Sequence, residues 1–178
     1  MMVCESCHKA EVSIRFGEAQ MCLDCYNGEM AKELGVQAES YPETVSIRDG
    51  EGEPHVFHLK KRLDQEGIFM EAVEKGTGYC AFEIEGDLHG NQGELLLELF
   101  AKIERGLAER FVLAGELVSD RLAGTIAYDK DREEIPFVVV DGKTYKWEEI
   151  GQMLARFEGF QLKLEMVDPL DEIRWEED

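Results

Sequence analysis

Two C-x-x-C pairs near the start of the chain restrict its folding more than any other feature. Cys4 and Cys7 form the first pair, and Cys22 and Cys25 form the second after a gap of fourteen residues. Each pair lets a tight turn direct two sulfurs at one point, and two such turns supply the four soft ligands of a tetrahedral zinc site. The sequence therefore predicts one structural Zn²⁺ per chain, held by Cys4, Cys7, Cys22 and Cys25.

Other chemistries of paired cysteines fit less well. The stretch "CESCH" matches the C-x-x-C-H of c-type haem attachment, but haem attachment leaves the second pair unexplained. A thioredoxin-like redox site needs a single pair on a βαβ frame. A rubredoxin-like iron site uses the same four sulfurs and stays open, although both pairs lack the Pro and Gly residues typical of rubredoxins. His8 adjoins a ligand, but four thiolates already complete the shell, so we expect His8 in a solvated turn.

The sequence also indicates a cellular compartment. A run of about 18 apolar residues, which a transmembrane helix needs, is missing from the sequence. The first residues also lack the basic and apolar regions of a signal peptide. We therefore expect a cytoplasmic protein, in which thiols stay reduced and paired cysteines more often hold a metal than form disulfides.

The charge restricts the partners. The chain of 178 residues carries 39 acidic and 19 basic side chains, a formal net charge of −20. Such a surface repels phosphate backbones, because proteins bind nucleic acids by neutralising phosphates with Lys and Arg, and it repels anionic lipids as well. We expect neither nucleic acid nor membrane as a partner. A nucleic-acid-associated zinc ribbon remains an alternative, but it requires a basic patch that the sequence does not show.

Residues 1–39 predict a small zinc module. A short hairpin is expected over 11–21, where polar and apolar residues alternate and Gly17 turns the chain. A helix then begins at the second cysteine pair and ends at Gly35. Turn, hairpin, turn and helix in this order form a treble clef or zinc ribbon. Because the module contains few apolar residues, we expect it to need the metal in order to fold.

A polar linker at 36–43 leads into a predicted α+β domain over 40–168. Its strands come in runs, which indicates a largely antiparallel sheet with two amphipathic helices on one face. We expect this domain to fold without metal. An acidic, mobile tail follows over 169–178, in which Trp175 is the one residue expected to dock. Strands are predicted at 44–48, 54–62, 67–73, 79–85, 121–128, 136–140 and 160–166, and helices at 92–112 and 147–157.

Two polar groups of this domain are candidate sites. His55 and His58 form H-x-x-H, but residues three apart on a strand point to opposite faces, so we do not expect them to share a metal. The loop over 86–94 is polar and contains His89, which makes an enzyme with His89 as acid–base catalyst the main alternative function. Polar composition is common in loops, however, and no phosphate-binding or nucleophile motif accompanies it. We therefore expect a protein without catalytic residues.

Two stretches resemble known families. The first 35 residues, with Cys4-x2-Cys7, the hairpin and "MCLDCY" before the helix, resemble the four-cysteine treble-clef modules at the start of bacterial proteolysis adaptors and chaperone subunits. The stretch "VVVDGKTYKWEEIGQMLARFEGFQLKLEMVD" resembles an uncharacterised bacterial family of zinc-ribbon proteins. In the proteolysis proteins such modules hold protein partners or form dimers. The resemblance implies a zinc-binding interaction or adaptor protein whose partner is an unknown protein, and it allows a homodimer.

Overall fold

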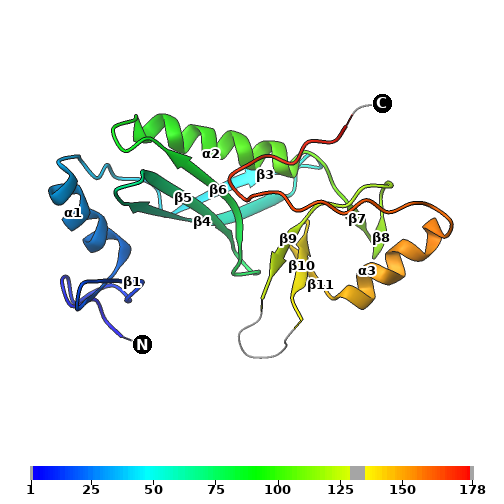
Figure 1. The fold of residues 1–178 in the computed structure, drawn as a ribbon, viewed down its shortest axis with the longest axis horizontal. Coiled ribbons are helices and arrows are strands. Elements are labelled where there is room, and N and C mark those ends of the chain that lie inside the picture. Colours follow the sequence, from blue (N-terminus) through cyan, green and yellow to red (C-terminus); the bar gives the residue numbers. More distant parts are fainter. Residues whose placement is uncertain (1, 129–134, 177–178) are drawn as a thin grey trace.

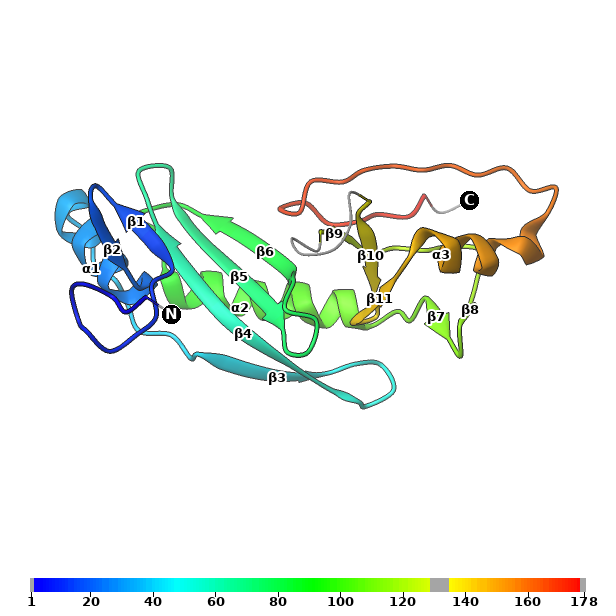
Figure 2. The same ribbon diagram turned by 90° about the horizontal axis from the view of Figure 1, so that it is seen from below.

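The computed structural model describes residues 2–128 and 135–176 and shows an α+β protein with antiparallel sheets and three α-helices (Figure 1 and Figure 2). Among the described residues, no helix is long and apolar enough to cross a membrane. The helices are α1 (Leu23–Leu34), α2 (Gln92–Leu107) and α3 (Trp147–Leu154), with a 3-10 turn at Ala155–Phe157. The strands are β1 (Ile14–Phe16), β2 (Ala19–Met21), β3 (Thr44–Arg48), β4 (Pro54–Leu63), β5 (Ile68–Glu74), β6 (Cys80–Gly86), β7 (Val112–Leu113), β8 (Glu116–Leu117), β9 (Thr125–Ala127), β10 (Phe137–Val140) and β11 (Lys143–Tyr145).

The N-terminal segment follows the predicted order of hairpin and helix. Strands β1 and β2 pair in antiparallel orientation, and Gly17 makes the turn between them with φ of 62°. Helix α1 ends at Gly35, whose φ of 68° is the left-handed conformation that a residue without Cβ adopts easily. Both glycines therefore act as the sequence pattern indicates.

The main sheet is a meander in the order β3-β4-β5-β6, with all neighbours antiparallel. The strands predicted at 44–48, 54–62, 67–73 and 79–85 are confirmed within one residue at each end. Helix α2 lies along the sheet (Figure 1), and its Leu99 and Ile103 are fully buried against it. Asn91 caps the start of α2, because its side chain accepts a hydrogen bond from the Glu94 amide over 3.0 Å.

One hydrophobic core, which we call the sheet core, joins α1 to the main sheet and α2. Tyr26, Met30 and Ala31 of α1 are buried in the same cluster as the inward side chains of the sheet. The apolar contacts therefore cross the predicted module boundary at residue 39. The boundary itself stays a prediction. The buried members of the sheet core are Tyr26, Met30, Ala31, Ile47, Phe57, Leu59, Leu63, Ile68, Met70, Ala72, Leu95, Leu99 and Ile103.

A second cluster, the C-terminal core, lies between the three-stranded sheet β11-β10-β9, the β7-β8 hairpin and α3. Phe111 belongs to this cluster, and α2 ends at Leu107 rather than at the predicted residue 112. The Asp141 carboxylate accepts hydrogen bonds from the amides of Phe111 and Val112 over 2.9 and 2.7 Å. These amides are thereby held outside a helix, and Phe111 faces the second core. The buried members of the C-terminal core are Phe111, Val112, Leu117, Val138, Val140, Ile150 and Met153.

The C-terminal stretch differs from the prediction. The strand predicted at 160–166 is wrong, because these residues pair with no strand in the described parts of the chain. The predicted helix at 147–157 is present as α3 and its 3-10 continuation. Trp175 docks as expected: its ring lies 6.1 Å from that of Phe111, and the Arg121 guanidinium lies over it at 5.3 Å.

Candidate metal centre

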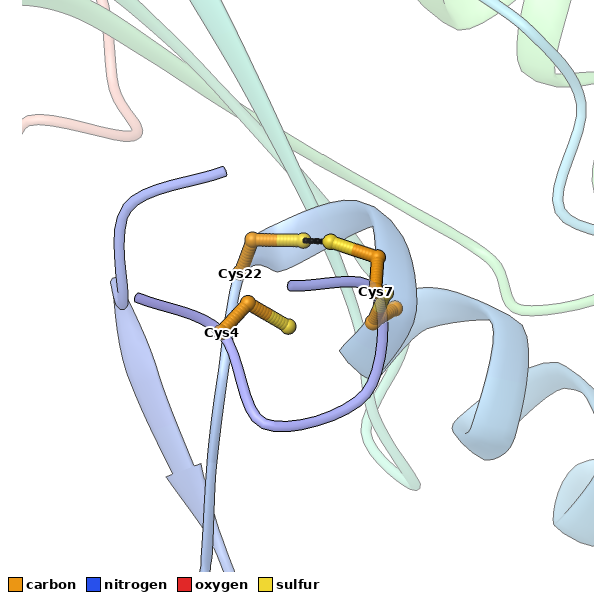
Figure 3. A group of neighbouring side chains, drawn as sticks. Cys4, Cys7 and Cys22 are labelled. Atoms are coloured by element: carbon orange, nitrogen blue, oxygen red, sulfur yellow. Dashed lines mark hydrogen bonds between the residues drawn. The ribbon is translucent and has the colours of Figure 1, made fainter. Parts of the chain in front are cut away.

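The four cysteines of the two pairs come together in space. Their Sγ atoms all lie within 4.8 Å of one another, and the Sγ atoms of Cys7 and Cys22 are 3.9 Å apart. Figure 3 shows the sulfurs of Cys4, Cys7 and Cys22 directed at a common point. In a tetrahedron with Zn–S distances of about 2.3 Å, adjacent sulfurs are about 3.8 Å apart. The cluster therefore has the dimensions of a four-sulfur metal site, and 3.9 Å is too long for a disulfide bond.

The first cysteine pair is shaped by a tight turn. The His8 amide donates to the Cys4 carbonyl over 2.9 Å, and the Cys4 amide donates to the Ala10 carbonyl over 2.8 Å. His8 adopts φ of 53°, and its side chain is exposed. The structure thus places His8 in a solvated turn, as the sequence predicts, and directs Cys4 and Cys7 inward.

The second pair is positioned by the start of α1. Cys22 is the N-cap residue with extended backbone, and Cys25 lies in the first helical turn. Positive charge at a helix N-terminus favours thiolates nearby. The two pairs are held together through the hairpin, because the Glu5 amide donates to the Gln20 carbonyl over 2.9 Å and the Gln20 amide to the Glu5 carboxylate over 3.1 Å.

The two cysteine pairs differ in their electrostatics, because the pKa is lowered for both thiols of the first pair and raised for both thiols of the second. Hydrogen bonds from the backbone of Cys7 and Cys22 lower the pKa of Cys4 to about 6. Backbone hydrogen bonds from Ala10 and Lys9 lower the pKa of Cys7. Burial, in contrast, raises the pKa of Cys22 to about 12. A bound cation would favour the thiolate form of all four cysteines, and metal binding would release the remaining protons.

His55 and His58 lie on opposite faces of β4, as the spacing predicts. His55 is mostly buried, and its Nδ1 lies 2.7 Å from a Glu74 carboxylate oxygen while its Nε2 lies 3.3 Å from Asp49. His58 is exposed. His55 thus joins the β3-β4 turn to β5 and shares no ligand position with His58.

The polar loop at 86–94 is occupied by turn and capping hydrogen bonds. The Asp87 side chain accepts from the His89 amide over 2.8 Å, and Asn91 caps α2. A hollow of about 230 Å³ adjoins the loop, but its lining residues do not include His89, whose side chain is exposed. The loop residues that make these hydrogen bonds therefore shape the entry into α2.

Sequence reasoning missed a buried polar contact between the cysteine helix and the sheet. Strand β3 ends before the last residues of β4, and Asn27 of α1 occupies the open edge there. Its Nδ2 donates to the Lys61 carbonyl over 2.7 Å, and its Oδ1 accepts from the Leu63 amide over 2.9 Å. The side-chain amide thus makes the two hydrogen bonds that a neighbouring strand would make.

The Lys61 side chain is the second feature that was missed. Its exposed fraction is 2%, and its ammonium group donates to the Gln92 side chain over 2.8 Å and to the Glu39 carbonyl. Gln92 in turn donates to the Gln37 carbonyl over 2.5 Å. The network fixes the linker onto β4 and α2. The burial of Lys61 could have been predicted from the sequence, because alternation along β4 places Lys61 on the same face as Leu59 and Leu63.

Comparisons with known proteins divide the chain into three successive segments. Models of three domains of unknown function match it: DUF7685 over residues 3–37, DUF7686 over 39–108 and DUF7713 over 115–171. No curated protein matches the chain significantly, and no solved structure does. The first match contains all four clustered cysteines, and the gap between the second and third lies where the sheet core gives way to the C-terminal core. None of the three descriptions names a metal, a partner or a reaction.

Proposed function

We propose that this protein binds one structural Zn²⁺ through Cys4, Cys7, Cys22 and Cys25 and acts through contacts with another protein. The observation that supports a metal site is that the four cysteine sulfurs lie within 4.8 Å of one another. A set of four cysteines is typical of structural zinc, and it leaves no open position for a substrate or a reactive water. The ion would hold the treble-clef-like turns and hairpin onto the start of α1.

The arrangement of the sheet core supports a structural role for the ion. Strands β1 and β2 contribute only partly buried side chains, among them Ile14, Phe16 and Met21, whereas α1 is anchored by fully packed residues. Residues before α1 therefore have little apolar burial of their own. The metal would supply the missing stability and present this segment as an ordered surface.

The interaction role rests on the closed sulfur shell and the charge. A net charge of −20 favours a partner with a complementary basic surface, because matched potentials accelerate encounter and exclude wrong partners. It also makes nucleic acid an unfavourable ligand. We place this activity in the cytoplasm, where the four thiols would stay reduced and available to zinc.

The metal is tested by elemental analysis of the full chain purified under reducing conditions. We expect close to one zinc per chain. Cys22→Ser should abolish tight binding, because a hydroxyl is a much poorer ligand than a thiolate for this ion. His8→Ala is the matched control in the same segment and should retain the zinc. Iron at the same stoichiometry without zinc, or a haem absorbance band, would contradict the assignment.

The interaction role is tested separately by affinity capture and mass spectrometry. The zinc-loaded wild type and His8→Ala should capture the same protein, which should then bind the purified chain directly. Cys22→Ser should lose it if the zinc segment forms the contact. The role is rejected if no captured protein binds the purified chain in a direct assay, even when the zinc is confirmed.

A further inference from the structure

Residues 160–167 form an apolar segment that is held in place but left uncovered. Gly159, with φ of 89°, turns the chain away from the end of α3. Figure 2 shows the stretch running back from α3 along the margin of the molecule. Beyond it, the Lys102 ammonium group donates to the carbonyls of Pro169 and Leu170 over 2.8 and 3.0 Å. At the start of the segment, the Phe160 amide donates to the Phe157 carbonyl over 3.0 Å, so the segment is held at both ends.

The side chains of this segment alternate as they do in a half-buried strand. Lys163 and Glu165 are two residues apart and form an ion pair at 3.5 Å, so they share one side. The intervening side is apolar, and each of its four side chains is between 62% and 75% exposed. Scattered exposed apolar residues are normal, but a continuous row of them marks an interaction site. The row consists of Phe160, Leu162, Leu164 and Met166.

A complementary edge lies on the same chain. Strand β9 is the outermost strand of its sheet among the described residues. Ile126 of β9 is paired with Val138 of β10 and therefore shares its face, yet Val138 is buried in the C-terminal core whereas Ile126 is 51% exposed. One more strand beside β9, with its apolar side on this face, would cover Ile126 and satisfy the edge.

The charge distribution indicates what occupies this edge. Residues 122–128 carry no charged side chain, and residues 159–167 carry one Lys and one Glu. In a chain with a net charge of −20, two copies repel each other over most of their surfaces. These two apolar stretches of low charge therefore oppose self-association less than the acidic remainder of the surface does.

We propose that residues 160–167 of one copy add as a strand to β9 of a second copy, and that the second copy does the same in return. Adding a strand to an exposed sheet edge is a common mode of protein recognition. The reciprocal exchange closes in a two-fold dimer, because each copy supplies one segment and one edge. The dimer goes beyond the proposed function and does not depend on the metal.

The test measures the mass of the zinc-loaded full chain by sedimentation over a wide concentration range. The wild type should dimerise, and Leu162→Lys/Leu164→Lys should weaken dimerisation by about tenfold or more. Gln161→Lys/Glu165→Gln changes the charge by the same amount on the polar side and should dimerise like the wild type. Ile126→Lys changes the other half of the interface and should also weaken dimerisation by about tenfold or more. Because all of these side chains are exposed in the single chain, each variant should melt close to the wild type at concentrations at which the wild type is monomeric.

Hydrogen exchange locates the contact. Amides of residues 160–166 and of β9 should become protected as the protein concentration rises. A monomer at every concentration would overturn the proposal, and so would a dimer that survives both lysine variants. Protection of the same amides in a monomer would overturn it as well, because the segment would then dock on its own chain.

Discussion

Asn27 and Lys61 join the cysteine-bearing helix to the main sheet: the Asn27 side-chain amide donates to the Lys61 carbonyl over 2.7 Å. Asn27 is 3% exposed, so the contact lies in a region from which water is excluded. Hydrogen bonds in such surroundings are costly to leave unmade. Helix α1, which follows Cys22, is therefore fastened to the main sheet, and the candidate metal centre is connected to the fold through it.

Replacing Asn27 by Ala should lower the free energy of unfolding by about 1–3 kcal/mol, because the Lys61 carbonyl and the Leu63 amide lose their partner. Chemical denaturation of the zinc-loaded protein measures the change. Glu33→Ala, at an exposed position of the same helix, is the control and should have little effect. Equal stability of Asn27→Ala and the wild type would show that the edge of β4 is satisfied in another way.

Removing the metal should disturb more than residues 1–39. The sequence favours a domain over 40–168 that stands without metal, but the buried side chains of α1 belong to the sheet core. We now expect a strong chelator to increase hydrogen exchange across Cys4–Leu34 and also at the end of β4. The C-terminal core shares none of these side chains, so β10 and α3 should keep their protection.

Two outcomes would contradict this expectation. Unchanged protection of β4 would mean that α1 stays docked without the metal, and loss of protection in β10 would mean that all three segments unfold together. Cys22→Ser, measured without chelator, controls for direct effects of the chelator and should reproduce the same pattern.

The sequence predicts the elements whose signals are local. The main-sheet strands and α2 alternate or repeat over many residues, and Gly17 and Gly35 occupy the turn and helix end that their residue type favours. The meeting of the four cysteines is likewise predicted from their spacing alone, because two C-x-x-C turns can direct their sulfurs at one ion. Strands as short as β7 and β8, with two residues each, contain too little pattern to be found.

The features that the sequence does not predict depend on contacts between residues far apart in the chain. Alternation over 160–166 is a true strand pattern, but a strand needs an edge to pair with, and within the single chain these residues pair with none of the strands in the described residues. The end of α2 depends on Asp141, about thirty positions from the amides that it binds. Asn27 has no local signal as a buried residue, because its partner is the open edge of β4.

Stability should depend on pH through His55. Burial of the ring lowers its pKa, but hydrogen bonds and charge from Glu74 and Asp49 outweigh this, and the pKa of His55 is raised above its ordinary value. The stabilisation is therefore complete below the unfolded pKa of about 6.5 and is lost as pH rises through the folded pKa. The free energy of unfolding should fall as the pH rises across this window.

The variant His55→Gln should remove this pH dependence and lower stability at the acidic end of the window by about 1–3 kcal/mol, because Gln carries no positive charge to pair with Glu74 and Asp49. Denaturant titrations at several pH values measure both effects. His58→Gln is the matched control on the exposed face of the same strand and should preserve the slope. A slope that persists in His55→Gln would assign the titration to another group.

Glycine at position 106 of α2 should be required for packing despite its weak helix propensity. A Cβ at this position would lie 2.3 Å from the Phe82 ring, and that ring packs edge-to-face on Phe57 with centroids 5.9 Å apart. Ala is about 1 kcal/mol more favourable than Gly in a helix interior. Overpacking a core usually costs about 1–3 kcal/mol, so Gly106→Ala should destabilise the protein or at best leave it unchanged.

The matched substitutions are Gly28→Ala in α1 and Gly151→Ala in α3, where an added Cβ would meet no atom within 4 Å. Both should raise the free energy of unfolding by about 0.5–1 kcal/mol, since only the helix propensity changes. The three variants differ in what the new methyl group contacts. Ranking their free energies of unfolding, measured in denaturant, therefore isolates the contact with Phe82. If Gly106→Ala is stabilised as much as the other two, the Phe82 ring can move aside, and the packing of this ring between α2 and Phe57 is looser than the distances indicate.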